Sequence, residues 1–280
     1  MTAAPTALIT LSAEGAKLLA PVAAALPGAR LYIHESVGSE SGEPARESGE
    51  APAVERFTRV AELTAALFPV CRGLIYAAPA GVVVRAIAPL IRSKYDDPAV
   101  VVLDAGGRWA VSLLAGHEGR ANALAIRVAN ILGAEPVVTT TTEALKSVIV
   151  GIGCRRGTPA ERIVAAVNSA LAEAAVAIEE VRLIASADLK ADEAGLLAAA
   201  EVLGVPVRFI PAPEIRACIR EFTHSDLVKE RVNLPAVAEP AALLAGSRTR
   251  FISRKKAYNG ITIALAREGF PWAGSAPKIP

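Results

Sequence analysis

Apolar and polar positions follow two periods along the chain. Short apolar runs rich in β-branched residues alternate with longer stretches in which apolar residues recur every three or four positions. This alternation predicts βα units around mostly parallel sheets. In the first half, strands are predicted at 6–11, 29–34, 73–77 and 99–104, followed by an apolar run at 109–114 and a closing strand at 135–142. Helices are predicted at 13–26, 59–71, 81–91 and 118–132.

The same pattern restarts at Val148. Strands are predicted at 148–153, 181–186, 206–210, 249–253 and 261–266, with helices at 159–173 and 192–203. A restart in a chain of 280 residues favours two domains. We therefore predict an α/β fold with two domains, 1–145 and 146–267, each a mostly parallel sheet flanked by helices, followed by a tail, 268–280.

One segment departs from both periods. Residues 36–55 are rich in Gly, Ser, Glu and Pro and contain almost no large apolar side chain. Such a composition predicts an exposed, mobile loop. Two explanations remain open, a disordered insertion and a substrate lid.

Composition and charge exclude several classes of protein. Lys and Arg number 30 against 28 Asp and Glu, which is not the basic excess of a nucleic-acid binder. The 3 cysteines are far apart, and the 3 histidines are isolated, so we expect no disulfide framework, no protein-bound metal and a reducing compartment. The start lacks the basic region of a signal peptide, and charged residues and prolines interrupt the longest apolar stretch, 73–91. We expect a cytoplasmic protein without a nucleic-acid or membrane partner.

A glycine-rich turn follows the predicted strand 148–153. It reads Gly151-Ile152-Gly153-Cys154-Arg155-Arg156-Gly157-Thr158-Pro159, with Thr158 predicted as the N-cap of the next helix. Free backbone NH groups at a helix start favour anions, and two arginines add donors suited to carboxylate or phosphate. The alternative is a plain glycine turn with two solvated arginines.

The spacing of these glycines also bears on cofactor choice. It is one residue longer than the dinucleotide fingerprint, and no acidic residue ends a clear second strand about 20 residues later. The turn therefore disfavours a nicotinamide or flavin enzyme.

A second polar cluster, Gly116-His117-Glu118-Gly119-Arg120-Ala121-Asn122, lies where an apolar run meets the predicted helix 118–132. A His and a Glu at a helix start, at the carboxyl edge of a sheet, are placed as a general acid/base pair would be. Alternatively, Glu118 only complements the helix dipole and His117 caps the turn.

Three further groups carry charge. In the segment 188–193, Asp192 and Glu193 are expected to cap the next helix, which leaves Asp188 and Lys190 as candidates for polar contacts with a substrate. Glu239 and the basic turn 254–260, which contains Lys255, either bind a substrate or are only solvated surface residues.

The combination of segments resembles a known family. The segments 73–91, 94–104 and 112–122 resemble the amino-terminal domain of the cobalt-precorrin-5A hydrolases (CbiG) of anaerobic cobalamin biosynthesis. The segments 151–158, 188–193, 235–244 and 255–267 resemble the carboxy-terminal domain of that family. The chain is therefore identified as a short member of it.

The resemblance implies a reaction on a ring-contracted cobalt tetrapyrrole. Water opens a δ-lactone and acetaldehyde then leaves, which gives cobalt-precorrin-5B. Cobalt is carried by the substrate, so no cofactor is expected, and neighbouring corrin methyltransferases are possible partners. The chemistry needs a base, a donor for the oxyanion, and cationic anchors for the acetate and propionate groups.

We assign acid/base catalysis to His117 and Glu118. Substrate binding is assigned to Gly151, Gly153, Arg155, Arg156, Gly157, Thr158, Asp188, Lys190, Glu239 and Lys255.

Three features depart from the family pattern. Longer members carry an additional segment between the two halves, whereas here Glu143 runs almost directly into Val148. Arg120 stands where many relatives have a small residue, and the segment 36–55 has no counterpart.

Two other functions compete with this interpretation. A non-catalytic tetrapyrrole binder or carrier is one, because a short protein of the aerobic pathway resembles only the carboxy-terminal domain. The amino-terminal resemblance argues against it. A nucleotide-dependent oxidoreductase is the other, and the glycine spacing disfavours it.

Overall fold

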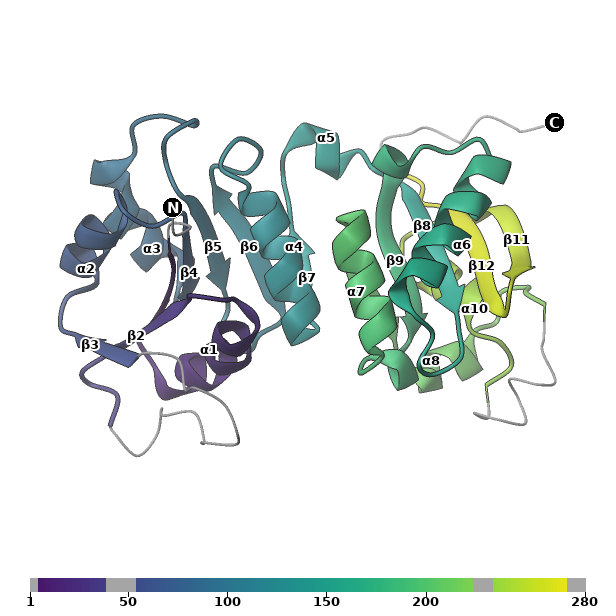
Figure 1. Ribbon diagram of the computed structural model, residues 1–280, viewed down its shortest axis with the longest axis horizontal. Coiled ribbons are helices and arrows are strands. Elements are labelled where there is room, and N and C mark those ends of the chain that lie inside the picture. The colour runs from purple at the N-terminus through teal and green to yellow at the C-terminus, as the bar shows by residue number, and fades with distance from the viewer. Residues whose placement is uncertain (1–4, 39–53, 224–233, 271–280) are drawn as a thin grey trace. The chain divides into compact units, whose positions relative to one another are not determined.

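The computed structural model describes residues 5–38, 54–223 and 234–270. The chain divides into two compact units, Met1–Thr140 and Thr141–Pro280 (Figure 1). Each unit is a mixed sheet flanked by helices, which confirms the predicted fold class. The predicted loop 36–55 and tail 268–280 lie mostly outside the described residues. Within those residues, no helix is both long and apolar enough to cross a membrane.

The first unit contains a seven-stranded sheet with the order β3-β2-β1-β4-β5-β6-β7. Its strands are β1 (Thr6–Thr10), β2 (Arg30–His34), β3 (Val54–Phe57), β4 (Gly73–Ala77), β5 (Ala99–Leu103), β6 (Trp109–Leu114) and β7 (Glu135–Val137). Strands β1 to β5 are parallel, β6 is antiparallel to β5, and β7 is parallel to β6. The carboxyl ends of β6 and β7 therefore lie at the edge where the other five strands begin.

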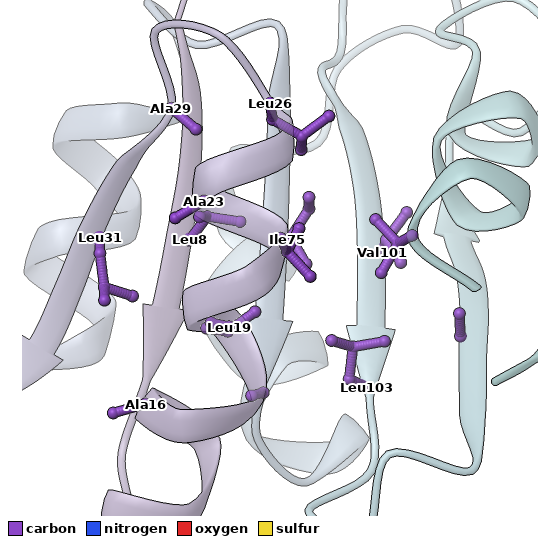
Figure 2. Packing of buried hydrophobic residues seen from close by; sticks show 14 of the residues in the cluster. Leu8, Ala16, Leu19, Ala23, Leu26, Ala29, Leu31, Ile75, Val101 and Leu103 are labelled. Atoms are coloured by element: carbon purple, nitrogen blue, oxygen red, sulfur yellow. The ribbon is translucent and has the colours of Figure 1, made fainter. Parts of the chain in front are cut away.

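Helices cover both faces of this sheet. Helices α1 (Ala13–Ala25) and α4 (Ala121–Leu132) bury their apolar sides against one face, where Leu8, Ile75 and Val101 point (Figure 2). Helices α2 (Val60–Leu67) and α3 (Ala80–Ile87), followed by the 3-10 turn η1 (Ala88–Leu90), cover the other. On that face Tyr76 shares a hydrogen bond of 2.9 Å with Thr64, and burial raises its pKa to about 12.

The second unit contains a five-stranded sheet with the order β10-β9-β8-β12-β11. Its strands are β8 (Val148–Gly153), β9 (Val181–Ala187), β10 (Val207–Ile210), β11 (Arg250–Tyr258) and β12 (Ile261–Arg267). Strands β8, β9 and β10 are parallel, whereas β11 and β12 form an antiparallel hairpin that joins the sheet through β8.

Within the described residues, two helices lie on each face of this sheet. Helices α6 (Ala160–Glu173) and α7 (Ala194–Leu203) pack on one face, and α8 (Ala212–Ala217) and α10 (Ala238–Leu244) pack on the other. The described part of the unit also contains three short elements, α5 (Thr141–Ala144), η2 (Ile178–Glu180) and η3 (Asp188–Lys190). A Cβ on Gly151 would lie 2.0 Å from the Ala238 carbonyl oxygen, so this glycine lets α10 approach β8 closely.

Several predicted boundaries are wrong. Helix α4 begins at Ala121 instead of residue 118, because Arg120 has a left-handed φ of 66° that a helix does not permit. The strand predicted at 135–142 ends at Val137, and the threonines that follow lead into α5. Strand β3 was not predicted, because it is a four-residue edge strand with two exposed charged residues and no apolar run.

Candidate functional site

The amino-terminal turn, residues 115–120, connects β6 to α4. Because α4 begins at Ala121, His117 and Glu118 lie in the turn and not at the helix start as predicted. The turn does follow the carboxyl end of its own strand β6, but this is the edge where β1 to β5 begin, since β6 is antiparallel to β5. Ala115 and Arg120 both have left-handed φ values, 58° and 66°, which cost on the order of 1 kcal/mol each in a non-glycine residue.

A buried polar network fixes the carboxyl end of this turn. The Ser112 hydroxyl donates to Asn122 Oδ1 at 2.8 Å, and Asn122 Nδ2 donates to Thr140 Oγ1 at 2.9 Å. Asn122 is only 8% exposed, and its backbone NH donates to the Gly116 carbonyl at 3.0 Å. A Cβ on Gly116 would lie 2.8 Å from Asn122 Oδ1, so this approach needs glycine. The network therefore links β6, α4 and the segment after β7.

A buried carboxylate orders the neighbouring segment. Asp97, 6% exposed, accepts backbone NH groups from Arg92 and Ser93 at 3.1 to 3.2 Å. A Cβ on Gly119 would lie 3.2 Å from the Asp97 carbonyl oxygen, so the turn packs directly against this segment. Lys94, from the same segment, lies 3.5 Å from Glu118 Oε1.

His117 and Glu118 are exposed above this support. Lys94 holds the Glu118 carboxylate, whereas no partner is found for the His117 imidazole among the described residues. An imidazole that is free of internal hydrogen bonds is available to accept a proton from water or from a substrate.

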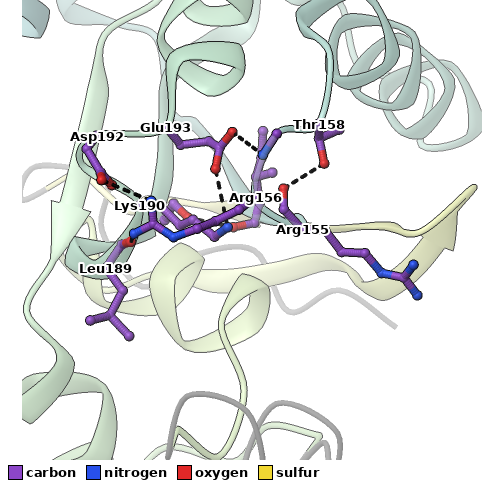
Figure 3. A network of polar contacts seen from close by, with 10 residues as sticks. Arg155, Arg156, Thr158, Leu189, Lys190, Asp192 and Glu193 are labelled. Carbon is purple, nitrogen blue, oxygen red and sulfur yellow. Dashed lines mark hydrogen bonds and ion pairs between the residues drawn. The ribbon is translucent and has the colours of Figure 1, made fainter.

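The carboxy-terminal turn, residues 154–158, lies at the carboxyl end of β8 (Figure 3). Its anion-binding position is occupied by the protein itself, because the Gly157 NH donates to Glu193 Oε1 at 2.9 Å. Pro159, not Thr158, is the N-cap of α6, so that prediction is wrong. The Thr158 hydroxyl instead donates to the Arg155 carbonyl at 2.7 Å and closes the turn.

The two arginines of this turn have different environments. Arg156 forms an ion pair with Asp192 at 2.9 Å and donates to the Leu189 carbonyl at 3.1 Å. The Arg156 hydrogen bond lowers the pKa of Asp192. The Arg155 guanidinium points away from this network in Figure 3, and no partner is found for it among the described residues.

The segment 188–193 also differs from the prediction. Helix α7 begins at Ala194, and neither Asp192 nor Glu193 caps it with its side chain, because both side chains bind the turn 154–158. Lys190, whose side chain is 16% exposed, lies 3.5 Å from Glu193 Oε2. These contacts place a half-buried ion pair beneath the turn.

Asp188 and Cys154 lie at the carboxyl ends of neighbouring strands. Asp188 Oδ2 accepts the Ala212 NH at 3.1 Å, whereas the buried Oδ1 has no partner among the described residues. Burial raises the pKa of the Cys154 thiol, with an opposing contribution from Lys190.

Glu239 and Lys255 are brought together, but by the protein's own backbone. Glu239 in α10 is fully buried and accepts the Lys255 NH at 2.9 Å as well as the Thr223 NH. Lys255 Nζ donates to the Thr223 carbonyl at 3.0 Å. Lys255 lies in β11, so the basic turn predicted at 254–260 is wrong for this residue.

Three residues that support these turns were not assigned to a site from the sequence. Asp97 and Asn122 lie within the family-like segments, and Glu193 was taken only as a helix cap. The signal for Glu193 is weak, since it depends on a contact between segments 36 residues apart. Within the described part of the chain, no group of three or more His, Cys, Asp and Glu residues could hold a metal ion.

Sequence models of one family match both units. The model described as Cobalamin synthesis G N-terminal matches residues 62–143, and Cobalamin synthesis G C-terminus matches 148–266. The chain belongs to the cobalamin synthesis G (CbiG) family. This confirms the resemblance inferred from the sequence.

Named relatives match one or both units of this CbiG chain. A cobalt-precorrin-5A hydrolase of Salmonella typhimurium is 26% identical over 351 residues, which cover 92% of this chain and 96% of the relative. A protein of the same name from Priestia megaterium is 26% identical over 73% of this chain and 80% of its own length. Protein CobE of Sinorhizobium sp. is 40% identical over 128 residues, 45% of this chain and 83% of CobE.

A solved structure of CobE, a protein from the cobalamin biosynthetic pathway, shares 33% identity with a TM-score of 0.40 and covers 43% of this chain and 89% of that chain. The alignment with the Salmonella protein, 351 residues, is longer than this 280-residue chain, so that relative contains residues without a counterpart here.

Proposed function

We propose that this CbiG protein is a cobalt-precorrin-5A hydrolase. The observation that carries the proposal is the extent of the relationship, which covers 92% of this chain and 96% of a relative with that name. Both units are therefore related to that enzyme, including the unit that holds His117 and Glu118. The substrate is a tetrapyrrole of cobalamin biosynthesis.

The proposed reaction opens the δ-lactone of the ring-contracted cobalt tetrapyrrole. The water oxygen bonds to the lactone carbonyl carbon, the ring C–O bond breaks, and a water proton passes to the His117 imidazole. The released alkoxide takes up a proton to become a hydroxyl group. Glu118, the next residue of the turn and paired with Lys94, offsets part of the imidazolium charge through its nearby negative charge and without a hydrogen bond to the imidazole.

In the second step the new hydroxyl group loses its proton to the base. The adjacent C–C bond breaks, acetaldehyde leaves, and the electron pair remains on the macrocycle, where it takes up a proton. Each step therefore needs one base that can return its proton, which an exposed imidazole can provide. The product is cobalt-precorrin-5B.

The remaining parts of the proposal concern binding. Arg155 binds a substrate carboxylate, because it is the arginine of the turn 154–158 that points away from internal partners. Cobalt arrives with the substrate, and no cofactor is required. Three unpaired cysteines favour a cytoplasmic location, where neighbouring corrin methyltransferases would deliver the substrate.

Acetaldehyde release tests this function. The purified chain is mixed with cobalt-precorrin-5A, acetaldehyde is measured through its reduction by alcohol dehydrogenase and NADH, and the corrinoid product is weighed by mass spectrometry. We expect one acetaldehyde per product molecule. If the chain binds the substrate but releases no acetaldehyde and leaves the corrinoid mass unchanged, the proposal is contradicted.

A second candidate function is a non-catalytic tetrapyrrole carrier. The observation that favours it is the 40% identity to Protein CobE, which is higher than the identity to either hydrolase but is confined to 45% of this chain. A carrier would bind the corrinoid and return it unchanged in the same assay, so a single experiment separates the two functions.

A further inference from the structure

The turn 154–158 has almost no freedom of its own. The start of α7 contacts it twice: Glu193, the residue before the helix, accepts the Gly157 NH at 2.9 Å, and a Cβ on Gly195 would lie 2.0 Å from the Thr158 carbonyl oxygen. Gly157 has a φ of 72°, which suits glycine and fixes the direction of the chain there. The conformation of the turn is therefore fixed by its contacts with the start of α7, without a ligand.

Glu193 is also the most buried charge in this network, with a side chain that is 5% exposed. A carboxylate removed from water needs hydrogen bonds and an opposite charge to offset its desolvation. The Gly157 NH and Lys190 supply these, one to each oxygen. The position where a glycine turn would hold a substrate anion is thus filled by Glu193.

The arginines divide between two tasks as a result. Arg156 is held by Asp192 and the Leu189 carbonyl and ties the turn to the segment 188–193. Arg155 points away from that segment (Figure 3). Its direction is set by the backbone of the turn, which the Thr158 hydroxyl closes at the Arg155 carbonyl.

We infer that Glu193 is a positioning residue, which seats the turn 154–158 through Gly157 and thereby presents Arg155 to a carboxylate of the substrate. The inference rests on the proposed function only for the identity of the substrate. Glu193 does not contact the substrate. It acts on binding through Arg155, so its loss raises KM more than it lowers kcat.

A double-mutant cycle tests this coupling. We measure kcat and KM for acetaldehyde release, and the Kd of cobyrinic acid, a stable corrin polycarboxylate, for Glu193→Ala, Arg155→Ala and the double variant. Each single variant is expected to raise KM and Kd about tenfold, since each loses one charge-assisted contact, with kcat within about threefold. The double variant is expected to be no worse than Arg155→Ala, because the two residues act in series. Additive losses would overturn the inference.

Two further variants separate positioning from general stability. Glu193→Gln keeps an oxygen for the Gly157 NH and should restore most of the affinity that Glu193→Ala loses. Gly195→Ala pushes the turn off α7 without changing any charge and should weaken binding as Glu193→Ala does. Glu179→Ala is the matched control, because this exposed acid precedes β9 at the opposite edge of the same sheet. Unchanged affinity in both Glu193→Ala and Gly195→Ala would overturn the inference.

Alkylation of Cys154 gives a measurement that needs no substrate. Glu193 raises the pKa of the Cys154 thiol and Lys190 lowers it, so Glu193→Gln should shift iodoacetamide labelling of Cys154 to lower pH. Peptide mass spectrometry separates Cys154 from Cys71 and Cys218, whose labelling should not change.

If the wild type binds cobyrinic acid but releases no acetaldehyde, the proposed hydrolase function fails, while the double-mutant cycle measured in Kd still tests the role of Glu193. If no variant changes Kd or Cys154 labelling, the inference fails by itself.

Discussion

The two polar turns of this molecule have the same place in the chain and opposite construction. Each follows a buried strand and precedes a helix, the turn 115–120 before α4 and the turn 154–158 before α6. In the first, the Asn122 NH binds the Gly116 carbonyl of the turn, Asp97 orders the neighbouring segment at Arg92 and Ser93, and the His117 and Glu118 side chains are exposed. In the second, Glu193 binds the backbone NH of Gly157 and Asp192 binds the Arg156 guanidinium.

The difference shows why a glycine-arginine turn is not by itself an anion site. A backbone NH that faces the protein interior must find a partner, and Glu193 provides it here. The two turns also differ in which residues have a left-handed φ. In the second turn it is Gly157, which adopts this conformation at little cost, whereas in the first turn Ala115 and Arg120 adopt it against a steric penalty. Strain retained at non-glycine residues next to exposed His117 favours the first turn as the place of chemistry.

The largest expected effect comes from breaking the first turn's chemistry. His117→Ala should lower kcat for acetaldehyde release by about 10²- to 10⁴-fold with KM within a few-fold, because the proposed mechanism makes this imidazole the group that moves a proton in the transition state. Its exposure predicts a change in unfolding free energy within about 0.5 kcal/mol. Steady-state kinetics and thermal unfolding of the same preparation check both parts.

Glu118→Gln and Glu62→Gln complete that experiment. Glu118→Gln should lower kcat less than His117→Ala, since it removes only the charge that supports the imidazolium. Glu62, exposed on α2 and paired with Arg59, is the control and should leave kcat unchanged. Full turnover in both His117→Ala and Glu118→Gln would remove the turn 115–120 from the mechanism.

The next effect is on the support beneath that turn. Asn122→Ala leaves the half-buried Ser112 and Thr140 hydroxyls without their partner and should destabilise the first unit by about 1 to 3 kcal/mol. Trp109 lies on β6 of this unit, so its fluorescence in a Trp272→Phe background follows urea unfolding of the unit. A loss below about 0.5 kcal/mol would mean that the network does not hold the turn.

Much of the fold followed from the apolar periods. Strands such as β4 and β5 are buried along their whole length, and their continuous apolar runs mark them clearly. Strand β3 was missed because an edge strand needs no such run. The direction of β6 was not foreseen, because the pattern of one strand does not contain its orientation relative to its neighbours. That direction decides which edge His117 occupies.

The sequence indicated which residues to consider for the candidate site, but it did not indicate which of them contact each other. The exposed His117 and Arg155 were found from residue type and place, since both follow apolar strands. Glu193 is the N-cap residue of α7, as predicted, but its side chain makes no capping hydrogen bond and accepts the Gly157 NH instead. Its contact with Gly157 crosses from β9 to β8 and is visible only after the strands are placed side by side.

A smaller effect separates the two arginines of the second turn. Arg155→Ala should raise the Kd of cobyrinic acid about tenfold, whereas Arg156→Ala should raise it less than about threefold, because Arg156 is already paired with Asp192. Isothermal titration calorimetry measures both. Equal losses would mean that Arg156 leaves Asp192 when the ligand binds, and the division of tasks between the arginines would be wrong.

The smallest expected effect is the titration of Asp192. Arg156 donates a hydrogen bond to this carboxylate and lowers its pKa, so the folded state binds the proton more weakly than the unfolded state does. The pair therefore contributes stability above the unfolded pKa of Asp192 and loses that contribution as the pH falls through the folded pKa. Both side chains are more than half exposed, so the effect on unfolding should be too small to measure.

Carboxyl-carbon NMR can still detect the shifted pKa of Asp192. Arg156→Ala should raise this pKa towards the ordinary aspartate value. The pKa of Glu180, lowered by the Ala177 NH and by Arg267, should not change in the same spectra. An Asp192 titration that is the same in both proteins would show that Arg156 does not hold this carboxylate in solution and is as free as Arg155 to bind a ligand.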